Sequence, residues 1–194
     1  MTIAEIVSAL KQKFGDAVLS TVEAHGEHTL CVTLAQVKNI LRYCRDEMAF
    51  DYLVDISSLD HMGEEPRFEM VYELYGYSHG KHLRIKSRVS EDASAPTVSD
   101  LWPTADWHER EVYDMMGIDF EGHPDLRRIL MWEGYPFFPL RKDFPLEGRP
   151  SDMPDVAFTG VAPLEGGPFV VLAVAVPSPV SRVPGRWTSA ITIV

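Results

Sequence analysis

The stretch that decides the fold runs from residue 107 to residue 146 and reads WHEREVYDMMGIDFEGHPDLRRILMWEGYPFFPLRKDFPL. Acidic and basic residues, glycines and prolines are crowded into this part of the chain. Its first dozen residues have helical periodicity, and the rest is broken by turn residues and prolines. We therefore expect a helix that continues into an extended segment.

The helix is predicted from one apolar stripe. Glu109, Val112, Tyr113 and Met116 recur at i, i+3, i+4 and i+7 and so lie on one side. Gly117 follows, and glycine adopts the left-handed conformation that ends a helix without a steric penalty. The helix should therefore end at Gly117, with the Glu109 carboxylate facing the core.

A carboxylate near a core needs a partner, because burying an unpaired charge is costly. Arg127, Arg128 or Arg141 could provide a bidentate one, so we predict a buried pair between Glu109 and an arginine. The alternative is a capping box, with Asp106 as the N-cap and Glu109 bonding to the local backbone. The two interpretations are compatible, and both stay open.

Other features of this stretch predict ordinary local structure. Arg110 and Asp114 are four residues apart, where opposite charges support a helix by only about 0.2 to 0.5 kcal/mol. Gly122-His123-Pro124 predicts a turn, and residues 125–130 are expected to form a short second helix with the proline near its first position.

The chain before this stretch reads as alternating helices and strands. Thr2 and Glu5 form a capping box before an amphipathic helix that ends at Gly15. Residues 17–24 and 28–33 are predicted strands around a Gly26-Glu27 turn. Thr33 and Gln36 suggest a second capping box, before a helix with one apolar side: Leu34, Val37, Leu41, Cys44 and Met48.

Residues 51–59, 67–77 and 82–89 are three further predicted strands, and residues 91–96 a polar loop. With Gly80-Lys81 as the turn, Tyr77 would face Arg84 and Glu73 would face Arg88, on a polar face opposite an apolar one. The prediction is an α+β domain with an antiparallel-rich sheet and helices packed on it.

The end of the chain has a different character. Of the 14 prolines, 11 lie at or after Pro124, and such a density prevents helices and removes backbone donors. We therefore expect an α+β domain over residues 1–146 and an extended proline-rich arm over residues 147–194. The apolar residues 169–172 favour an arm that lies along a partner.

Composition excludes several functions. A net charge of −11 opposes phosphate backbones and anionic lipids, so nucleic acid and direct membrane contact are not expected. Cys31 and Cys44 are too few for an all-cysteine cluster and are expected to be reduced thiols. The longest apolar run, residues 169–176, is far shorter than the roughly 20 residues that span a bilayer. The chain start has no basic region typical of a signal peptide, which favours a bacterial, non-exported protein.

Two groups of residues could hold chemistry. His25 to His28 and His79 to His82 both read His-Gly-x-His, so each turn could bring two imidazoles onto one face for a metal. Further ligands are not evident, and exposed turn histidines are the favoured interpretation.

The second group is an acid, base or metal cluster made of His108, Glu109, Glu111, Asp114 and His123. It does not match the helical zinc-hydrolase spacing, and we favour a structural ion-pair network. The sequence contains no phosphate-binding loop, nucleophile elbow or dinucleotide-binding glycine pattern.

The segment from Pro139 to Leu146, PLRKDFPL, holds alternating charge between prolines and apolar residues. It suits docking to an acidic or polar groove on another polypeptide, and equally a loop pinned to its own domain. We favour a mixture of the two.

Three separated blocks resemble the 30 kDa subunit of respiratory NADH-quinone oxidoreductase (complex I). They occur in order at the family's spacing, and residues 97–102 look like its lead-in. The resemblance extends loosely over residues 1 to about 160, and the sequence after about Pro168 departs from the family. The family signature and interface residues are Glu109, Arg110, Glu111, Asp114, Gly117, Gly122, His123, Pro124, Arg127, Arg128, Pro139, Leu140, Arg141, Lys142 and Asp143.

The resemblance implies a cofactor-free structural subunit of the peripheral arm, without catalytic residues of its own. Its partners would be the 49 kDa subunit and neighbouring iron–sulfur subunits, with FMN and iron–sulfur clusters in those partners. The complex would pass electrons from NADH to quinone as a proton translocase, with this subunit peripheral on the cytoplasmic face of the bacterial inner membrane. One alternative is the equivalent subunit of an energy-converting hydrogenase or a ferredoxin- or F420-linked complex. The other is a free-standing metal-dependent enzyme.

Overall fold

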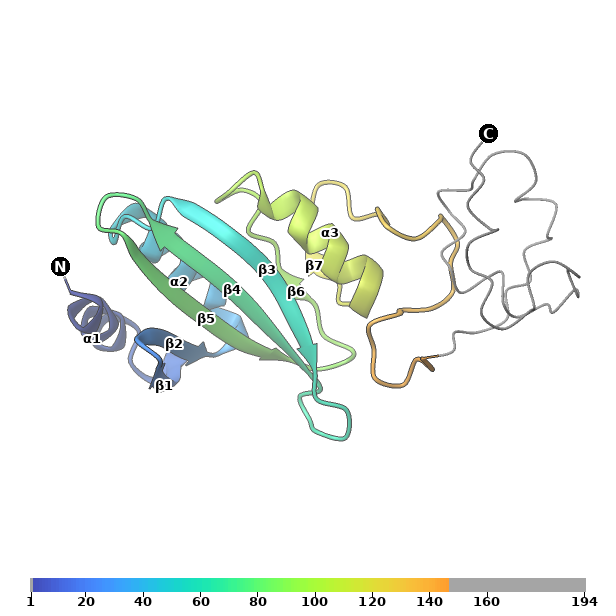
Figure 1. Ribbon diagram of the computed structural model, residues 1–194, viewed down its shortest axis with the longest axis horizontal. Helices are drawn as coiled ribbons and strands as arrows, with labels where there is room; N and C mark the ends of the chain where they lie inside the picture. Colours follow the sequence, from blue (N-terminus) through green and yellow to red (C-terminus); the bar gives the residue numbers. More distant parts are fainter. Residues whose placement is uncertain (1, 147–194) are drawn as a thin grey trace, which may run out of the picture. The chain divides into compact units, whose positions relative to one another are not determined.

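The computed structural model describes residues 2–146 (Figure 1). The chain opens with helix α1, Ile3–Phe14, and the predicted capping box is confirmed. The backbone N–H of Thr2 donates to a Glu5 carboxylate oxygen at 2.7 Å, and the Glu5 N–H donates to the Thr2 hydroxyl at 3.3 Å. The helix ends at Gly15, as predicted, and one 3-10 turn, η1 (Gly15–Ala17), leads into the sheet.

Strands β1, Val18–Ala24, and β2, Glu27–Val32, form the first hairpin. Its turn residues are His25 and Gly26, with φ of 55° and 80°, rather than the predicted Gly26-Glu27. Positive φ at both central positions matches the right-handed twist of a hairpin, and this favours the observed turn.

Helix α2, Leu34–Asp46, follows directly. Its apolar side is confirmed, with Val37, Ile40, Leu41 and Cys44 buried. The predicted second capping box is wrong, because the side chain of Thr33 makes no capping hydrogen bond. Burial raises the pKa of the Cys44 thiol to about 12, so this cysteine is a neutral core residue.

Three long strands complete the main sheet: β3, Tyr52–Asp60; β4, Phe68–Gly76; and β5, Lys81–Val89. The strand order is β1-β2-β5-β4-β3, and only β2 and β5 run parallel. The predicted α+β fold with an antiparallel-rich sheet is confirmed. The arm predicted for residues 147–194 lies outside the described residues.

The predicted register of the β4–β5 hairpin is wrong by four residues. Glu73 faces Arg84 and Tyr75 faces His82, and residues 77–80 form the turn. A Cβ on Gly76 would lie 2.2 Å from the His79 ring, so the loop folds back over this glycine. Because the slip is even, each side chain keeps its predicted face.

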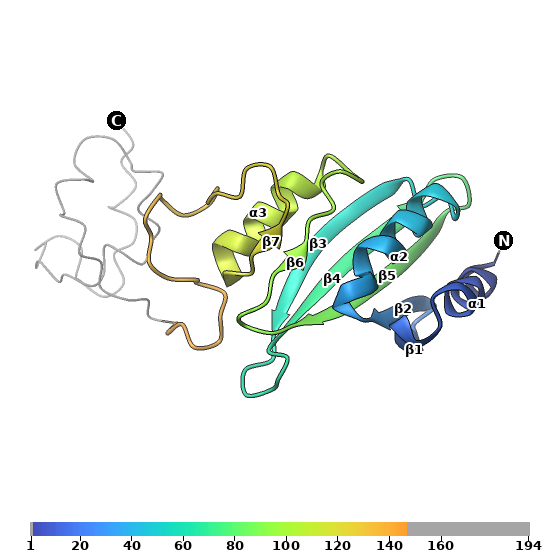
Figure 2. The same ribbon diagram turned by 180° about the vertical axis from the view of Figure 1, so that it is seen from behind.

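The core lies on one side of the sheet. Viewed from behind, α2 lies over β4 and β5, whereas no helix lies in front of β3, β4 and β5 in the first view (Figures 1 and 2). The inward face is fully buried, with Met70, Tyr72, Leu83 and Ile85 at its centre. The open face carries cross-strand ion pairs, including Lys86 with Glu69 at 3.0 Å. Burial of the apolar face holds the layers together.

The signature helix is α3, Ala105–Met116, and it ends at Gly117 in the left-handed conformation, as predicted. Two short strands, β6 (Ala95–Pro96) and β7 (Phe120–Glu121), pair in parallel on either side of it. Residues 125–130 are irregular, so the predicted second helix is wrong. No helix within residues 2–146 is both long enough and apolar enough to cross a membrane.

Candidate functional site

Asp114 is the best-bonded carboxylate of α3, and its side chain is fully buried. Its Oδ2 accepts three backbone N–H groups, from Ile129 at 2.9 Å, Leu130 at 2.6 Å and Met131 at 2.9 Å. A carboxylate that receives several backbone donors fixes the chain around it. Asp114 therefore holds residues 129–131 against the signature helix in place of the predicted short helix.

Arg128 completes this cluster. Its Nη1 donates to Asp114 Oδ1 at 2.6 Å and to the Asp114 carbonyl at 2.9 Å, and Nη2 donates to the Phe137 carbonyl at 3.2 Å. The guanidinium also lies 5.0 Å from the centroid of the Phe138 ring. One arginine thus ties the helix to two later parts of the chain.

Both predictions for the partner of Glu109 are wrong, although its burial is confirmed at 0% exposure. Glu109 Oε2 accepts the Thr97 hydroxyl at 2.6 Å, and Oε1 accepts the Val98 N–H at 2.7 Å. Arg128, one of the arginines considered for this pair, binds Asp114 instead. The lead-in after β6 therefore provides the donors that an arginine or a capping box was expected to provide.

His123 lies beside this carboxylate, with its Nε2 at 3.8 Å from Glu109 Oε2 and its side chain fully buried. Its Nδ1 accepts the Asp125 N–H at 3.0 Å, so the proton of the neutral ring is on Nε2, which lies 3.2 Å from the Asp106 carbonyl. Burial raises the pKa of Glu109, and the bonds from Thr97 and Val98 and the nearby imidazole oppose this shift.

Arg110 is also buried, at 5% exposure, contrary to the expected surface pair with Asp114. Its Nε donates to the Arg127 carbonyl at 3.2 Å, and its guanidinium lies 4.8 Å from the Trp107 ring centroid. Glu111 is exposed on the helix. The expected turn at Gly122-His123-Pro124 is confirmed, with Gly122 at a φ of 81°.

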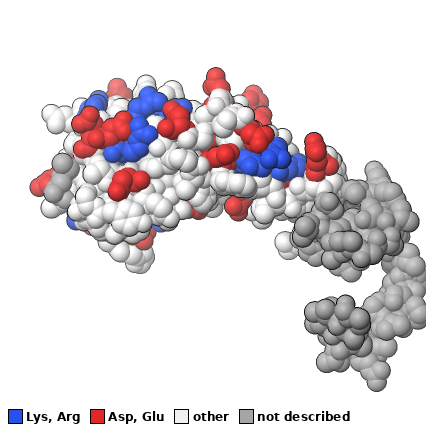
Figure 3. Space-filling model, turned by 90° about the horizontal axis from the view of Figure 1, so that it is seen from above, with Lys and Arg blue, Asp and Glu red and all other residues white. Residues whose placement is uncertain are grey.

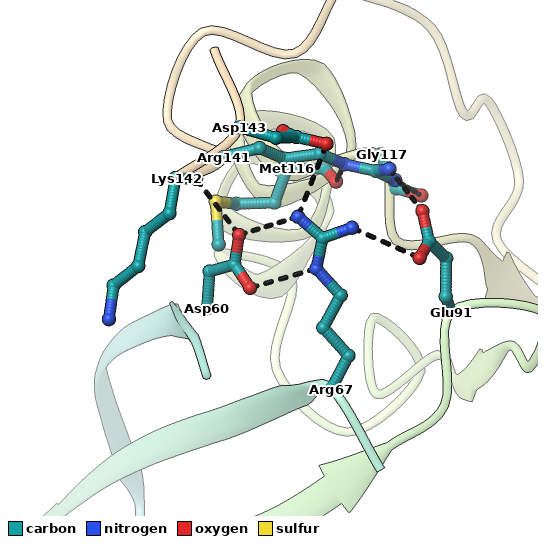
Figure 4. A network of polar contacts seen from close by, with 8 residues as sticks. All are labelled: Asp60, Arg67, Glu91, Met116, Gly117, Arg141, Lys142 and Asp143. Carbon is teal, nitrogen blue, oxygen red and sulfur yellow. Dashed lines mark hydrogen bonds and ion pairs between the residues drawn. The ribbon is translucent and has the colours of Figure 1, made fainter. Parts of the chain in front are cut away.

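Residues 139–146 are called the strap below. Within it, Arg141 binds the end of α3 (Figure 4): Nε donates to the Met116 carbonyl at 2.6 Å and Nη2 to the Gly117 carbonyl at 3.4 Å. Its Nη1 binds Glu91 at 2.7 Å. A Cβ on Gly117 would lie 2.6 Å from the Phe138 ring, so this glycine permits close packing as well as the left-handed turn.

A second arginine joins the strap to the sheet. Arg67, before β4, binds Asp60 through two bonds of 2.9 and 2.8 Å and Glu91 through one of 3.0 Å. Asp143 Oδ2 lies 3.5 Å from the same guanidinium, and the Lys142 N–H donates to Asp60 at 2.9 Å. The hydrogen bonds from Arg67 hold the pKa of Asp60 below its ordinary value.

Asp60, Arg67, Glu91 and Thr97 were missed by the sequence interpretation. They lie at strand ends and in a loop, and their spacing forms no recognisable motif. The pinned half of the mixed interpretation of the strap is confirmed, because Arg141 and Asp143 bind their own domain. Its docking half stays a prediction.

The histidine pairs expected at the two hairpin turns are wrong. Glu23 faces His28, and Tyr75 faces His82. His79 instead places its Nε2 at 3.1 Å from the Met48 carbonyl. Within residues 2–146, no group of three or more histidine, cysteine, aspartate or glutamate side chains is placed to hold a metal ion.

Residues 30–150 match the model of the family described as respiratory-chain NADH dehydrogenase, 30 Kd subunit. The NADH-quinone oxidoreductase C subunit 2 of Rhizobium meliloti (strain 1021) is 46% identical over 78% of this chain and 91% of its own length. The corresponding C subunit of Geobacter sulfurreducens is 44% identical over 73% of this chain and 89% of its own length. The chain therefore belongs to the family of the 30 kDa subunit of respiratory-chain NADH dehydrogenase.

A solved structure of the membrane-bound sulfane sulfur reductase, an archaeal respiratory membrane complex, contains a similar chain. The TM-score is 0.64 at 29% sequence identity, and the match covers 74% of this chain and 85% of that one. This fold therefore occurs in a respiratory complex that has another printed activity.

Proposed function

We propose that this chain is a structural, cofactor-free subunit of the peripheral arm of an NADH-quinone oxidoreductase. It packs against the 49 kDa subunit and supports electron transfer from NADH to quinone, while FMN and the iron–sulfur clusters lie in partner subunits. It is peripheral on the cytoplasmic face of the bacterial inner membrane and reaches the membrane through the complex, which is the proton translocase. Family membership and the NADH-quinone oxidoreductase relatives support this assignment.

The observation that carries the structural role is where the signature charges lie. Asp114, Glu109 and Arg141 each bind backbone groups of their own domain, at 2.6 to 2.7 Å for their shortest such bonds. A catalytic acid, base or ligand needs a free position toward a substrate or ion. These side chains instead determine how residues 117–143 fold around α3.

The exposed aromatic residues supply partner contacts. Trp107 is 60% exposed on α3, and Tyr77 is 66% exposed at the β4–β5 turn. Tryptophan and tyrosine are enriched at the energetic centres of protein interfaces. A protein that acts by packing against others is expected to present such side chains.

A second candidate keeps the scaffold and changes the complex. The similarity to a chain of the archaeal sulfane sulfur reductase favours it, because the same fold occurs in a machine with another printed activity. In that case the partners would be those of an energy-converting hydrogenase or a ferredoxin- or F420-linked complex. The function would again be structural.

Affinity purification of the tagged full chain from solubilised host membranes tests the proposal, with the other polypeptides identified by mass. The 49 kDa subunit and the iron–sulfur subunits of an NADH-quinone oxidoreductase are expected at one copy each per chain. Hydrogenase-type or F420-linked subunits would instead support the second candidate. Recovery of the chain alone, with intact NADH-quinone reductase activity in a deletion strain, would contradict both.

A further inference from the structure

The strap has two sides that differ in their bonding. Arg141 and Asp143 are bound within their own domain, Arg141 to Glu91 and Asp143 to Arg67. The alternate residues, Leu140 and Lys142, are exposed, and the Leu140 side chain is 63% accessible. Alternation along an extended segment thus separates an inner, bonded side from an outer side whose side chains make no such bonds.

Lys142 is unusual among the cations of this chain. Within residues 2–146, only Lys81 and Lys142 have a side-chain nitrogen without a hydrogen bond, an ion pair or an aromatic ring. The neighbouring carboxylates bind guanidinium groups instead, Asp60 and Asp143 on Arg67. The Lys142 side chain extends away from this network in Figure 4.

The backbone that carries Lys142 is held rigidly. Its N–H donates to Asp60 at 2.9 Å, and the Phe144 N–H donates to the Arg141 carbonyl at 3.0 Å. Earlier in the strap, the Leu140 N–H donates to the Met115 carbonyl at 3.1 Å. A preorganised segment loses little conformational entropy when it binds a partner.

We propose that the outer side of the strap, Leu140 and Lys142, is a docking edge for another polypeptide of the complex. Its occupant is an apolar groove with an acidic rim, which takes the leucine side chain and pairs a carboxylate with the Lys142 ammonium. Charge complementarity carries this choice, because the ammonium has no carboxylate partner within the described chain. The inference rests on the proposed function and names the chemistry of one contact.

Charge reversal tests the edge in the assembled complex. Lys142→Glu in the tagged full chain is expected to lower the recovery of partner subunits per chain by at least about tenfold, equivalent to about 1.4 kcal/mol. Lys81→Glu is the matched control, since it makes the same charge change at the other unpaired lysine, and it should recover partners as the wild type does. Equal recovery with Lys142→Glu would overturn the inference and leave the proposed function intact.

Cross-linking removes the dependence on folding of the variant. A carbodiimide, which joins an amine directly to a carboxylate, should link Lys142 of the wild-type complex to an aspartate or glutamate of another polypeptide. Lys142→Arg should lose this link and keep wild-type recovery, because it preserves the charge without a reactive amine. Links from Lys142 only to carboxylates of its own chain would overturn the inference. Failure of the wild-type chain to recover any partner would overturn the proposed function as well.

Discussion

Asp114 is the residue on which the irregular part of the fold depends most. Its carboxylate accepts three backbone N–H groups and one guanidinium, although they lie 14 to 17 residues away along the chain. A buried charge with partners of this quality is well compensated, and removing the charge leaves Arg128 and the N–H groups without their acceptor.

Asp114→Asn is therefore expected to lower the free energy of unfolding by about 3 to 5 kcal/mol. The matched control is Asp125→Asn, whose carboxylate pairs with Arg127 at the surface and should contribute within about 1 kcal/mol. Urea denaturation of the two variants and the wild type measures both effects. Equal effects of the two substitutions would contradict the role given to Asp114.

Gly117 makes a second prediction at this scale. Its φ is 70°, and an added Cβ would lie 2.6 Å from the Phe138 ring and 2.7 Å from an Arg141 nitrogen. Gly117→Ala should cost the conformational penalty of about 1 kcal/mol and, in addition, the displacement of the strap.

Gly134→Ala separates the two costs, because its φ is 84° and no atom lies within 4 Å of the added Cβ. Gly117→Ala should be the more destabilising variant by about 1 to 3 kcal/mol, measured as the difference in unfolding free energy. A smaller effect at Gly117 than at Gly134 would show that the close approach is unimportant.

Among the elements, the contact between the strap and the end of β3 gives a pH prediction. The hydrogen bonds from Arg67 lower the pKa of Asp60 from 3.8, helped by the Lys142 N–H and opposed by burial. Because the folded-state pKa lies below the unfolded one, this stabilisation is complete above about pH 3.8 and is lost as the pH falls through the folded-state pKa.

Asp60→Asn should consequently lower the unfolding free energy by about 1 to 3 kcal/mol at pH 7, and the difference from the wild type should shrink as the pH falls below 3.8. Urea titrations over an acid series measure this difference. A difference that stays constant through the acid range would mean that Asp60 does not contribute through its charge.

Most elements could be predicted from the sequence because local rules determine them. The capping box at Thr2, the apolar side of α2 and the left-handed glycine after α3 all depend on residues within a few turns of one helix. The register of the β4–β5 hairpin could not, because it depends on the packing of the His79 ring against Gly76.

The site was predictable in its membership and much less in its pairing. The burial of Glu109 follows from its place on the apolar stripe, but its donors, Thr97 and Val98, come from a lead-in segment without a periodic pattern. The identity of Asp114 as the acceptor for Arg128 depends on how residues 117–138 wrap around the helix. Such tertiary geometry has no signature in the spacing of charges.

At the scale of the whole molecule, the chain carries 29 acidic and 18 basic residues, yet the two kinds intermingle on the surface. One face of the molecule shows blue and red side chains lying next to one another (Figure 3). Paired charges of this kind hold the strands, the strap and the signature helix together and leave apolar and aromatic side chains for partners. That is the distribution expected of a protein whose function is to assemble with others.

The central claim is that the charged residues around α3 hold the fold and bind no redox group or catalytic metal. It is tested most directly by measuring iron, zinc, acid-labile sulfide and flavin in the full chain purified alone, beside the intact complex. The account predicts far less than one of any of these per isolated chain, with flavin and iron present in the complex. One tightly held flavin, cluster or metal ion per isolated chain would contradict it.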